Sequence, residues 1–290
     1  MNVLVTGASG QLGRSLRDSA VNSPHHFIFS DLVQDECTVS LDIADPEAVA
    51  EAVKAYEADV IVNCAAYTDV NRAESDAGKA ALINSYAPSV LAGAARDAGA
   101  LLMHISTDYV FNGNACVPYR EDDPTSPVSV YGKTKLDGEL NIKESGCRYM
   151  IFRTAWLYSN YGKNFYKTME ALTADKPLIK VVADQVGTPT FAGDLADTLV
   201  EIINNGMLDK TGIYHFTNEG VCSWYDFAKE ICDSFGHLCN VIPCRTEDFP
   251  TPAARPHYSV LDKTRVKNTF GIDIPHWKDS LKVCVMDFKK

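Results

Sequence analysis

The sequence predicts an α/β protein built on a doubly wound parallel sheet, with a smaller lobe toward the C-terminus. Two observations carry this prediction. Short runs that are apolar throughout alternate with segments of helical spacing over roughly the first 150 residues, as in parallel sheets covered by helices on both faces. The first of these runs leads into a glycine-rich turn that opens a helix, which is where doubly wound folds bind ligands.

The predicted strands are five short apolar runs, at residues 2–6, 27–30, 59–63, 100–106 and 149–153. Because these runs do not alternate with polar residues, they indicate strands buried on both faces. Helical spacing follows the first run, and the alanine-rich stretch 73–98 has the composition of a helix. In the second half, proline-bearing segments separate helical patterns near residues 193–205, 223–236 and 277–288.

The composition narrows the class of protein. The chain has 290 residues, 46% of them hydrophobic, and a formal net charge of −11. It contains no basic run, so neither nucleic acid nor an acidic membrane surface is an expected partner. No stretch approaches the roughly 18 apolar residues that span a bilayer. Nine cysteines without a CxxC pair, and a Met1 that leads directly into the first apolar run, predict a reduced, cytoplasmic protein.

The turn after the first predicted strand reads GASGQLG over residues 7–13. Its glycines allow a tight turn and a close approach of the backbone to a pyrophosphate at a helix N-terminus. The spacing is one residue wider than GxGxxG, so a turn without a ligand is the alternative. Asp31, which ends the second run, is placed to accept hydrogen bonds from an adenosine ribose, and this favours NADH. Arg14 would offset the repulsion between Asp31 and a 2′-phosphate, so NADPH stays open.

Tyr131 and Lys135 are four residues apart and would share one face of a helix. A nearby ammonium is expected to lower the pKa of a tyrosine, which then becomes a usable acid or base beside a carbonyl. The same spacing recurs at Tyr225 and Lys229, where an ordinary amphipathic helix is the favoured interpretation. Only Tyr131 follows a strand that ends in polar residues, at 106–108, where doubly wound folds bind ligands.

Together these motifs resemble the extended short-chain dehydrogenase/reductase superfamily, which acts largely on nucleotide sugars. Within it, the chain resembles the dTDP-4-dehydrorhamnose reductases over most of its length. The stretches that carry this resemblance are STDYVF at 106–111, the segment 124–135, RTAW at 153–156, Asn164-Phe165, DQVGTPT at 184–190 and Arg255-Pro256.

The resemblance implies a role for individual residues. It implies catalysis by Thr107, Tyr131 and Lys135; Ser106 is the less favoured hydroxyl, since adjacent strand residues face opposite ways. The implied cofactor site comprises Gly7, Gly10, Gln11, Leu12, Gly13, Asp31, Asp42, Ile43, Ala65, Ala66, Tyr67, Tyr131 and Lys135. The implied substrate site comprises Thr107, Asp108, Trp156 and Arg255. For Trp156 the alternative is a core aromatic, and for Arg255 it is a surface ion pair.

The same resemblance implies two domains. Residues 1–155 would form the NAD(P)-binding Rossmann domain, which would also take in about 187–218, and residues 156–290 would form mainly a substrate-binding lobe. Some reductases of this branch bind Mg²⁺ through glutamates at a dimer contact. Ser15 and Gly193 stand in the corresponding places here, so no metal is predicted, and the protein is expected to be a monomer or a homodimer.

The predicted activity is the reduction of the C4 keto group of dTDP-4-dehydro-β-L-rhamnose by NADPH or NADH. Related dehydratases carry Thr-Asp-Glu where this chain has Tyr109 in the third place, so reduction is favoured over elimination. An epimerase or another keto-sugar reductase is one alternative. A second is a non-catalytic regulator, because the β subunit of methionine adenosyltransferase resembles this branch, including residues 131–139. A third is a dinucleotide sensor that has no substrate. The RTAW and Asn164-Phe165 stretches favour the enzyme.

Overall fold

The computed structural model describes residues 1–289 and confirms the α/β fold class. Its centre is a seven-stranded sheet in which all neighbouring strands are parallel, in the order β11-β6-β5-β4-β1-β2-β3. The strands are β1 (Asn2–Thr6), β2 (His26–Asp31), β3 (Val39–Ser40), β4 (Val60–Asn63), β5 (Leu101–Thr107), β6 (Arg148–Thr154) and β11 (Gly212–His215). Because β1 pairs with β2 on one side and β4 on the other, the strand order reverses there and opens a crevice at the carboxyl ends.

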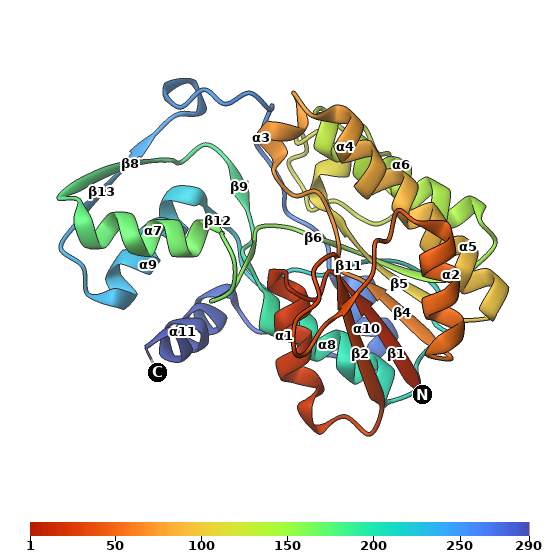
Figure 1. Ribbon diagram of the computed structural model, residues 1–290. Coiled ribbons are helices and arrows are strands. Elements are labelled where there is room, and N and C mark those ends of the chain that lie inside the picture. The colour runs from red at the N-terminus through yellow and green to blue at the C-terminus, as the bar shows by residue number, and fades with distance from the viewer. Residues whose placement is uncertain (290) are drawn as a thin grey trace.

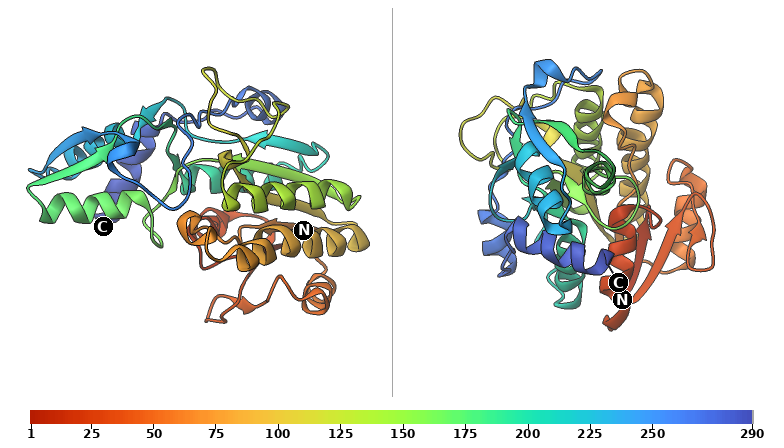
Figure 2. Two further views of the ribbon diagram at one scale, coloured as in Figure 1. Left: turned by 90° about the horizontal axis from the view of Figure 1, so that it is seen from above. Right: turned by 90° about the vertical axis from the view of Figure 1, so that its left-hand side faces the viewer.

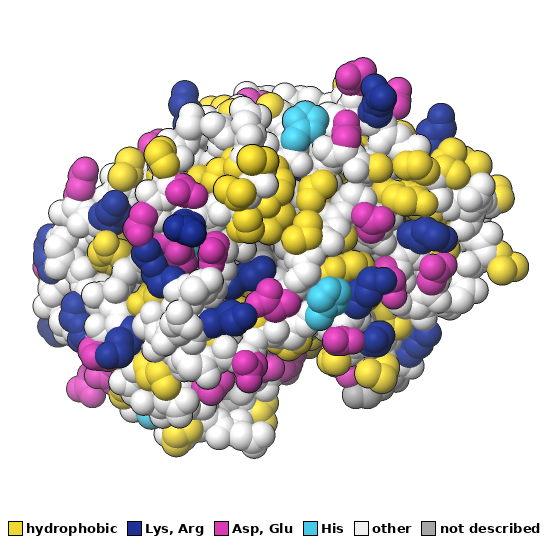
Figure 3. All heavy atoms as spheres, turned by 180° about the vertical axis from the view of Figure 1, so that it is seen from behind, with side chains coloured by type: hydrophobic (Ala, Val, Ile, Leu, Met, Phe, Trp, Pro, Cys, Tyr) yellow, Lys and Arg dark blue, Asp and Glu magenta, His cyan; other side chains and the backbone are white. Residues whose placement is uncertain are grey.

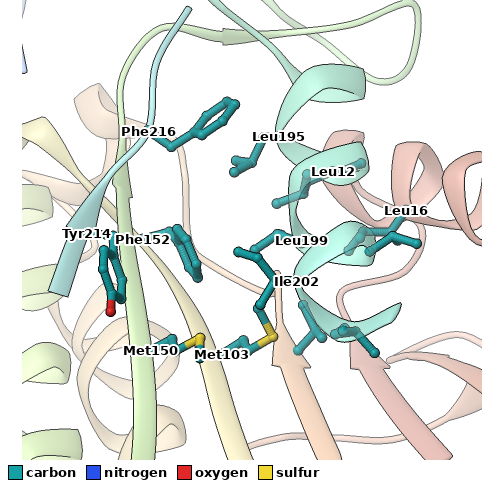
Figure 4. Close-up of a cluster of buried hydrophobic side chains, with 14 of the residues drawn as sticks. Leu12, Leu16, Met103, Met150, Phe152, Leu195, Leu199, Ile202, Tyr214 and Phe216 are labelled. Atoms are coloured by element: carbon teal, nitrogen blue, oxygen red, sulfur yellow. The ribbon is translucent and has the colours of Figure 1, made fainter. Parts of the chain in front are cut away.

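Helices cover both faces of the sheet, as Figures 1 and 2 show. On one face, α1 (Gln11–Ser19) and α8 (Ala192–Asn204) pack against the strands, and α10 (Thr264–Phe270) joins the same core. Figure 4 shows Leu195, Leu199 and Ile202 of α8 facing Phe152 and Met103 of the sheet. The other face is covered by α2 (Pro46–Ala55), α5 (Ala87–Ala98) and α6 (Val130–Glu144).

The alanine-rich stretch 73–98 is not one helix. It is divided into the end of α3 (Val70–Ala73), α4 (Ala77–Ala81), a π-helical turn (Leu82–Tyr86) and α5. The buried Asn84 lies in the π-helical turn, where its side chain accepts the Tyr67 N–H at 2.8 Å and donates to the Tyr67 carbonyl at 3.1 Å. Because this side chain replaces a backbone partner for the loop after β4, the irregular turn braces one edge of the crevice.

The remaining elements form a second lobe with its own core around Tyr158, Tyr166, Phe227 and Trp277, seen on the left of Figure 1. Its helices are α7 (Phe165–Asp175), α9 (Trp224–Phe235) and α11 (Trp277–Phe288). Its short strands pair as β8 (Leu178–Val182) with β13 (Asn240–Cys244), β7 (Leu157–Tyr158) with β10 (Thr190–Phe191), and β9 (Val186–Gly187) with β12 (Cys222–Ser223).

The helices predicted near 193–205, 223–236 and 277–288 agree with α8, α9 and α11 to within one residue. After the first part of the second lobe, the chain returns to the sheet, where α8 covers one face and β11 forms an edge strand. The division between two domains at residues 155 and 156 stays a prediction. Within residues 1–289, no helix combines the length and the hydropathy that crossing a bilayer requires. On the face shown in Figure 3, acidic and basic side chains are interspersed.

Candidate active site

A cavity of about 810 Å³ lies between the carboxyl ends of the strands and the second lobe. It brings together sequence-predicted residues that are up to about 250 positions apart in the chain. Those that line it are Gly7, Gly10, Gln11, Leu12, Asp31, Asp42, Ile43, Ala65, Ala66, Tyr67, Thr107, Asp108, Tyr131, Lys135, Trp156 and Arg255. Gly13 is the exception and lies outside the lining.

Close backbone contacts require glycine at two positions of the turn over residues 7–13. Gly7 has a φ of +71°, and a Cβ there would lie 2.5 Å from the Ala65 nitrogen. A Cβ on Gly13 would lie 2.4 Å from the Gly7 carbonyl oxygen, so this glycine allows α1 to pack against the turn instead of contacting a ligand. Gly10 is the N-cap of α1 and offers no side-chain hydrogen bond. The first N–H groups of α1 therefore need an acceptor from elsewhere.

Asp31 closes this end of the cavity. One of its carboxylate oxygens accepts the Ser9 N–H at 2.9 Å and the other accepts the Leu32 N–H at 2.7 Å. Arg14 donates from Nε to the Ser9 carbonyl at 3.2 Å and lies over the Tyr161 ring. Arg14 is therefore held against the outside of the turn and does not line the cavity.

Tyr131 lies in the first turn of α6, where the Ser129 side chain caps the helix by accepting the Gly132 N–H at 3.1 Å. A Cβ on Gly132 would lie 2.2 Å from the Tyr109 carbonyl oxygen, so this glycine lets the helix approach closely. The Tyr131 ring meets the Tyr109 ring edge-on at 5.5 Å between centroids. The expectation of a lowered pKa for Tyr131 is wrong for this state of the site, because burial raises it and a hydrogen bond with Thr107 offsets only part of that rise.

Lys135 lies one turn further along α6 and is 1% exposed. Its ammonium nitrogen donates to the Ile105 carbonyl at 2.6 Å and lies 3.4 Å from His104 Nε2. Burial lowers the pKa of Lys135 to about 8, although the charge of Glu139 acts in the opposite direction. The lysine is therefore poised to gain or lose a proton near neutral pH.

The two adjacent hydroxyls at the end of β5 have different partners. Thr107 donates to Asp108 at 2.9 Å and accepts the Tyr109 N–H at 3.2 Å. Ser106 donates to Glu139, which forms a buried bidentate pair with Arg153. Both residues line the cavity, but the Thr107 hydroxyl bonds to Asp108, another lining residue, while the Ser106 hydroxyl bonds to the ion pair.

Asp108 is 3% exposed, and its Oδ2 atom has no hydrogen-bond partner. Burial raises the pKa of Asp108 to about 6, while the nearby Ser259 and Thr107 side chains lower it in part. Thr154 Oγ1, at the end of β6, is also buried without a partner and also belongs to a lining residue. Buried polar atoms are normally satisfied, so these two oxygens mark places where a ligand would supply the missing hydrogen bonds.

Trp156 forms part of the wall contributed by the second lobe. Its backbone has a φ of +50°, which is uncommon for a bulky residue. Its ring stacks on Trp224 with 3.5 Å between centroids, and a Cβ on Gly187 would lie 2.7 Å from the indole. Thr190 donates its hydroxyl to the Ala155 carbonyl and its N–H to the Trp156 carbonyl. The DQVGTPT stretch therefore holds Trp156 at the cavity.

Arg255 reaches the cavity from the loop before α10. It donates from Nη1 to the Tyr109 hydroxyl at 3.0 Å and from Nη2 to Asn71 Oδ1 at 3.2 Å. Its partners are neutral, in contrast to the alternative of a surface ion pair. Lys79, Lys135 and Lys163 also line the cavity. Asp31, Asp42 and Asp108 line it as well, so the charges of the lining are close to balanced in a chain whose net charge is −11.

The sequence interpretation missed the cavity roles of Trp224, Thr154, Lys79 and Lys163. Trp224 begins α9 and meets Trp156 only through the tertiary fold, so no local pattern marks it. Asn164 was recognised only as part of a motif. Its side chain caps α7 by accepting the Lys167 N–H and donates to Gln11 Oε1 at 2.8 Å, so it links the second lobe to the glycine turn.

Among residues 1–289, no three His, Cys, Asp or Glu side chains are grouped as a metal site would require. Ser15 lies inside α1, where its hydroxyl donates to the Gln11 carbonyl at 3.1 Å.

Comparison with known proteins identifies the family. Residues 1–290 match the family described as the RmlD substrate binding domain. A dTDP-4-dehydrorhamnose reductase from Burkholderia thailandensis is 40% identical over 302 residues, which cover 99% of each chain. The crystal structure of such a reductase from Clostridium acetobutylicum has a TM-score of 0.94 and 43% identity, covering 100% of both chains. The Bacillus anthracis reductase, solved in complex with NADP, has a TM-score of 0.90 and 35% identity over 99% of both chains. The chain therefore belongs to the dTDP-4-dehydrorhamnose reductase family.

Proposed function

We propose that this protein reduces the C4 keto group of dTDP-4-dehydro-β-L-rhamnose to give dTDP-L-rhamnose, with NADPH or NADH as the reductant. The observation that carries the proposal is the cavity of about 810 Å³. It joins a glycine turn suited to a dinucleotide to a Thr107–Tyr131–Lys135 group suited to carbonyl chemistry. The full-length similarity to reductases of this name supports the same substrate.

The glycine turn fits a dinucleotide cofactor. The first N–H groups of α1 lack a side-chain cap and lie at the cavity, so they suit a pyrophosphate. Asp31 would hold the adenosine ribose, Asp42 and Ile43 would lie near the adenine, and Ala65 to Tyr67 would flank the groove. When bound, the cofactor supplies the hydride that the keto carbon receives.

Tyr131 would supply the proton that the reduced oxygen requires. Its phenol is protonated at neutral pH, as a tyrosine ordinarily is, and that is the form that an acid needs. Thr107, which lines the same cavity, would hydrogen-bond the same substrate oxygen and fix its position. Lys135 would approach the nicotinamide ribose and, as an ammonium, stabilise the phenolate that remains.

The other wall would hold the sugar nucleotide. Asp108 offers its unpaired Oδ2 to a sugar hydroxyl. Trp156 would pack against the sugar ring, and the planar fork of Arg255 suits phosphate oxygens. Tyr109 stands where an elimination would need a second acid, so the site supports reduction without loss of water.

The test is the oxidation of NADPH and of NADH by the purified protein with enzymatically generated dTDP-4-dehydrorhamnose. We expect one reduced cofactor to be consumed for each dTDP-L-rhamnose formed. An epimerase would convert substrate without net consumption of cofactor, and a regulatory subunit would bind cofactor without turnover. Either result would contradict the proposal.

A further inference from the structure

A chain of buried polar side chains runs through the sheet from β1 to Lys135. Thr6, Asn63 and His104 are each at most 1% exposed, and they come from the neighbouring strands β1, β4 and β5. Thr6 donates to Asn63 Oδ1 at 2.8 Å, Asn63 Nδ2 lies 3.0 Å from His104 Nδ1, and His104 Nε2 lies 3.4 Å from Lys135 Nζ. The chain therefore ends on the lysine of the proposed catalytic group.

The direction of these hydrogen bonds is fixed at Asn63. The backbone N–H of Ala65 can only donate, and it reaches Asn63 Oδ1 at 3.1 Å. The carboxamide oxygen is therefore committed to Ala65 and Thr6, and its NH₂ group must face His104. Because Nδ1 of His104 then accepts a hydrogen bond, the proton of the neutral ring lies on Nε2.

This tautomer aims an N–H at Lys135. Two donors that face each other repel, so an ammonium on Lys135 has no favourable partner in Nε2–H. A neutral amine accepts that hydrogen through its lone pair while one of its own N–H groups donates to the Ile105 carbonyl. The ring stays neutral because burial and the Lys135 charge both lower the pKa of His104. The network therefore stabilises the neutral amine of Lys135 relative to its ammonium form.

We propose that Asn63 and His104 are positioning residues that fix the Nε2–H tautomer and thereby let Lys135 exchange its proton in every catalytic cycle. The inference rests on the proposed reductase function. When Tyr131 gives its proton to the substrate oxygen, the Lys135 ammonium returns one proton to the phenolate and becomes an amine. The His104 N–H stabilises that amine until a proton from solvent restores the ammonium.

Other charged and titratable groups around Lys135 act on the same equilibrium. Glu139, one turn further along α6, favours the ammonium. Cys64, after β4, faces the lysine as a neutral thiol, because burial raises its pKa to about 12. Glu139 is itself neutralised by Arg153 of β6 through a bidentate pair. Tyr131 lies one turn earlier on α6, and Asp108 lies at the end of β5. His104 differs from these groups in two ways. Its Nε2 atom lies beside the Lys135 nitrogen, and the ring proton can lie either on Nε2 or on Nδ1.

The first test needs no activity. Protein labelled with ¹⁵N in its seven histidines reports by NMR which ring nitrogen carries the proton, and the His104 signal is assigned by its loss in H104Q. We expect a neutral Nε2–H tautomer that does not titrate between about pH 6 and 8. A proton on Nδ1, or an ordinary histidine titration, would overturn the proposal while leaving the reductase function untouched.

The second test switches the tautomer. In N63D, the new carboxylate has no N–H to offer, so Nδ1 must carry the proton and Nε2 becomes an acceptor for the ammonium. Activity needs that ammonium as its proton source, and it is lost as pH rises through the pKa of Lys135. We expect N63D to move the basic limb of the kcat–pH profile upward by about one pH unit. H104Q, whose amide can also accept from Asn63 and donate to Lys135, should keep the limb near its original position.

A matched control separates the tautomer from the added charge. The N63D/H104F double variant carries the same carboxylate without a ring nitrogen, and it is compared with H104F alone. We expect the carboxylate to move the limb less in this pair than in the presence of His104. An equal shift in both backgrounds, or an N63D protein whose tautomer changes while its limb stays in place, would show that the network does not control Lys135.

Discussion

The two walls of the cavity are built in different ways. The wall on the sheet side consists of strand ends and the first turns of α6, and its polar groups are buried and tied to one another, as with Thr107, Asp108 and Lys135. The wall on the lobe side consists of stacked rings and a guanidinium from loops and from the start of α9, with Trp156 on Trp224 and Arg255 on Tyr109. None of these four side chains comes from a strand of the central sheet.

This difference separates chemistry from recognition. Proton transfer requires donor and acceptor positions held to within about 0.5 Å, together with suitable pKa values, and a rigid, desolvated frame maintains both. Binding a sugar nucleotide needs area and charge, which side chains on loops can supply. We therefore expect changes in the sheet wall to act on kcat and changes in the lobe wall to act on KM.

The largest effect is expected from Tyr131→Phe, which removes the proton donor while retaining the ring. General acid catalysis contributes roughly 10²- to 10⁴-fold, so kcat should fall by that factor. Binding of the cofactor, measured by fluorescence titration, should change little. Tyr225→Phe is the matched control, because Tyr225 has the same Tyr-x-x-x-Lys spacing but does not line the cavity. Full activity in the Tyr131 variant would refute the assigned role.

Arg255→Ala tests the lobe wall. Hydrogen bonds to charged groups contribute about 1.5–3 kcal/mol, so KM for the sugar nucleotide should rise by between about 10- and 150-fold while kcat changes much less. Steady-state kinetics at saturating cofactor measure both constants. The exposed Arg120, which lies outside the cavity lining, supplies the control Arg120→Ala. A fall in kcat with an unchanged KM would place Arg255 in the chemical step instead.

Gly187→Ala tests the support behind the lobe wall without altering a polar group. The added Cβ would lie 2.7 Å from the Trp156 indole, so the stacked rings must move. Overpacking of this kind costs about 1–3 kcal/mol, and we expect KM to rise about tenfold. Gly93→Ala is the control, since a Cβ there meets nothing within 4 Å. An unchanged KM would mean that Trp156 does not contact the substrate.

Sequence patterns predicted the sheet wall well because its signals are local. Each strand is an apolar run, the turn after β1 needs its glycines for close backbone contacts, and Tyr131 and Lys135 share one helix face. One local pattern misled: Gly13 belongs to the glycine motif, yet it packs against Gly7 and does not reach the cavity. The helical composition of 73–98 likewise concealed the π-helical turn, because Asn84 is placed there by its bonds to Tyr67.

The lobe wall was predictable only through family resemblance. The stack of Trp156 on Trp224 joins residues far apart in the chain, and neither has a periodicity that marks the contact. The spacing of Tyr131 and Lys135 also could not reveal that the pKa of Tyr131 is raised. An i, i+4 lysine predicts a lowered value, but burial dominates, and Lys135 is turned toward the Ile105 carbonyl.

The smallest expected effect concerns Asp31, which would bind the cofactor instead of the substrate. The choice between NADH and NADPH is expected to depend on its single charge. A carboxylate beside the adenosine ribose repels a 2′-phosphate, and two charges about 4 Å apart in water interact by about 1 kcal/mol. Asp31→Asn should therefore shift the ratio of kcat/KM for NADPH over NADH upward by about fivefold. Asp35→Asn removes a charge of the same sign from the neighbouring exposed loop, outside the cavity lining, and should leave the ratio unchanged. Because Arg14 is held by Ser9 and Tyr161, a preference that responds to Arg14→Ala but not to Asp31→Asn would mean that this arginine leaves the turn to meet the phosphate.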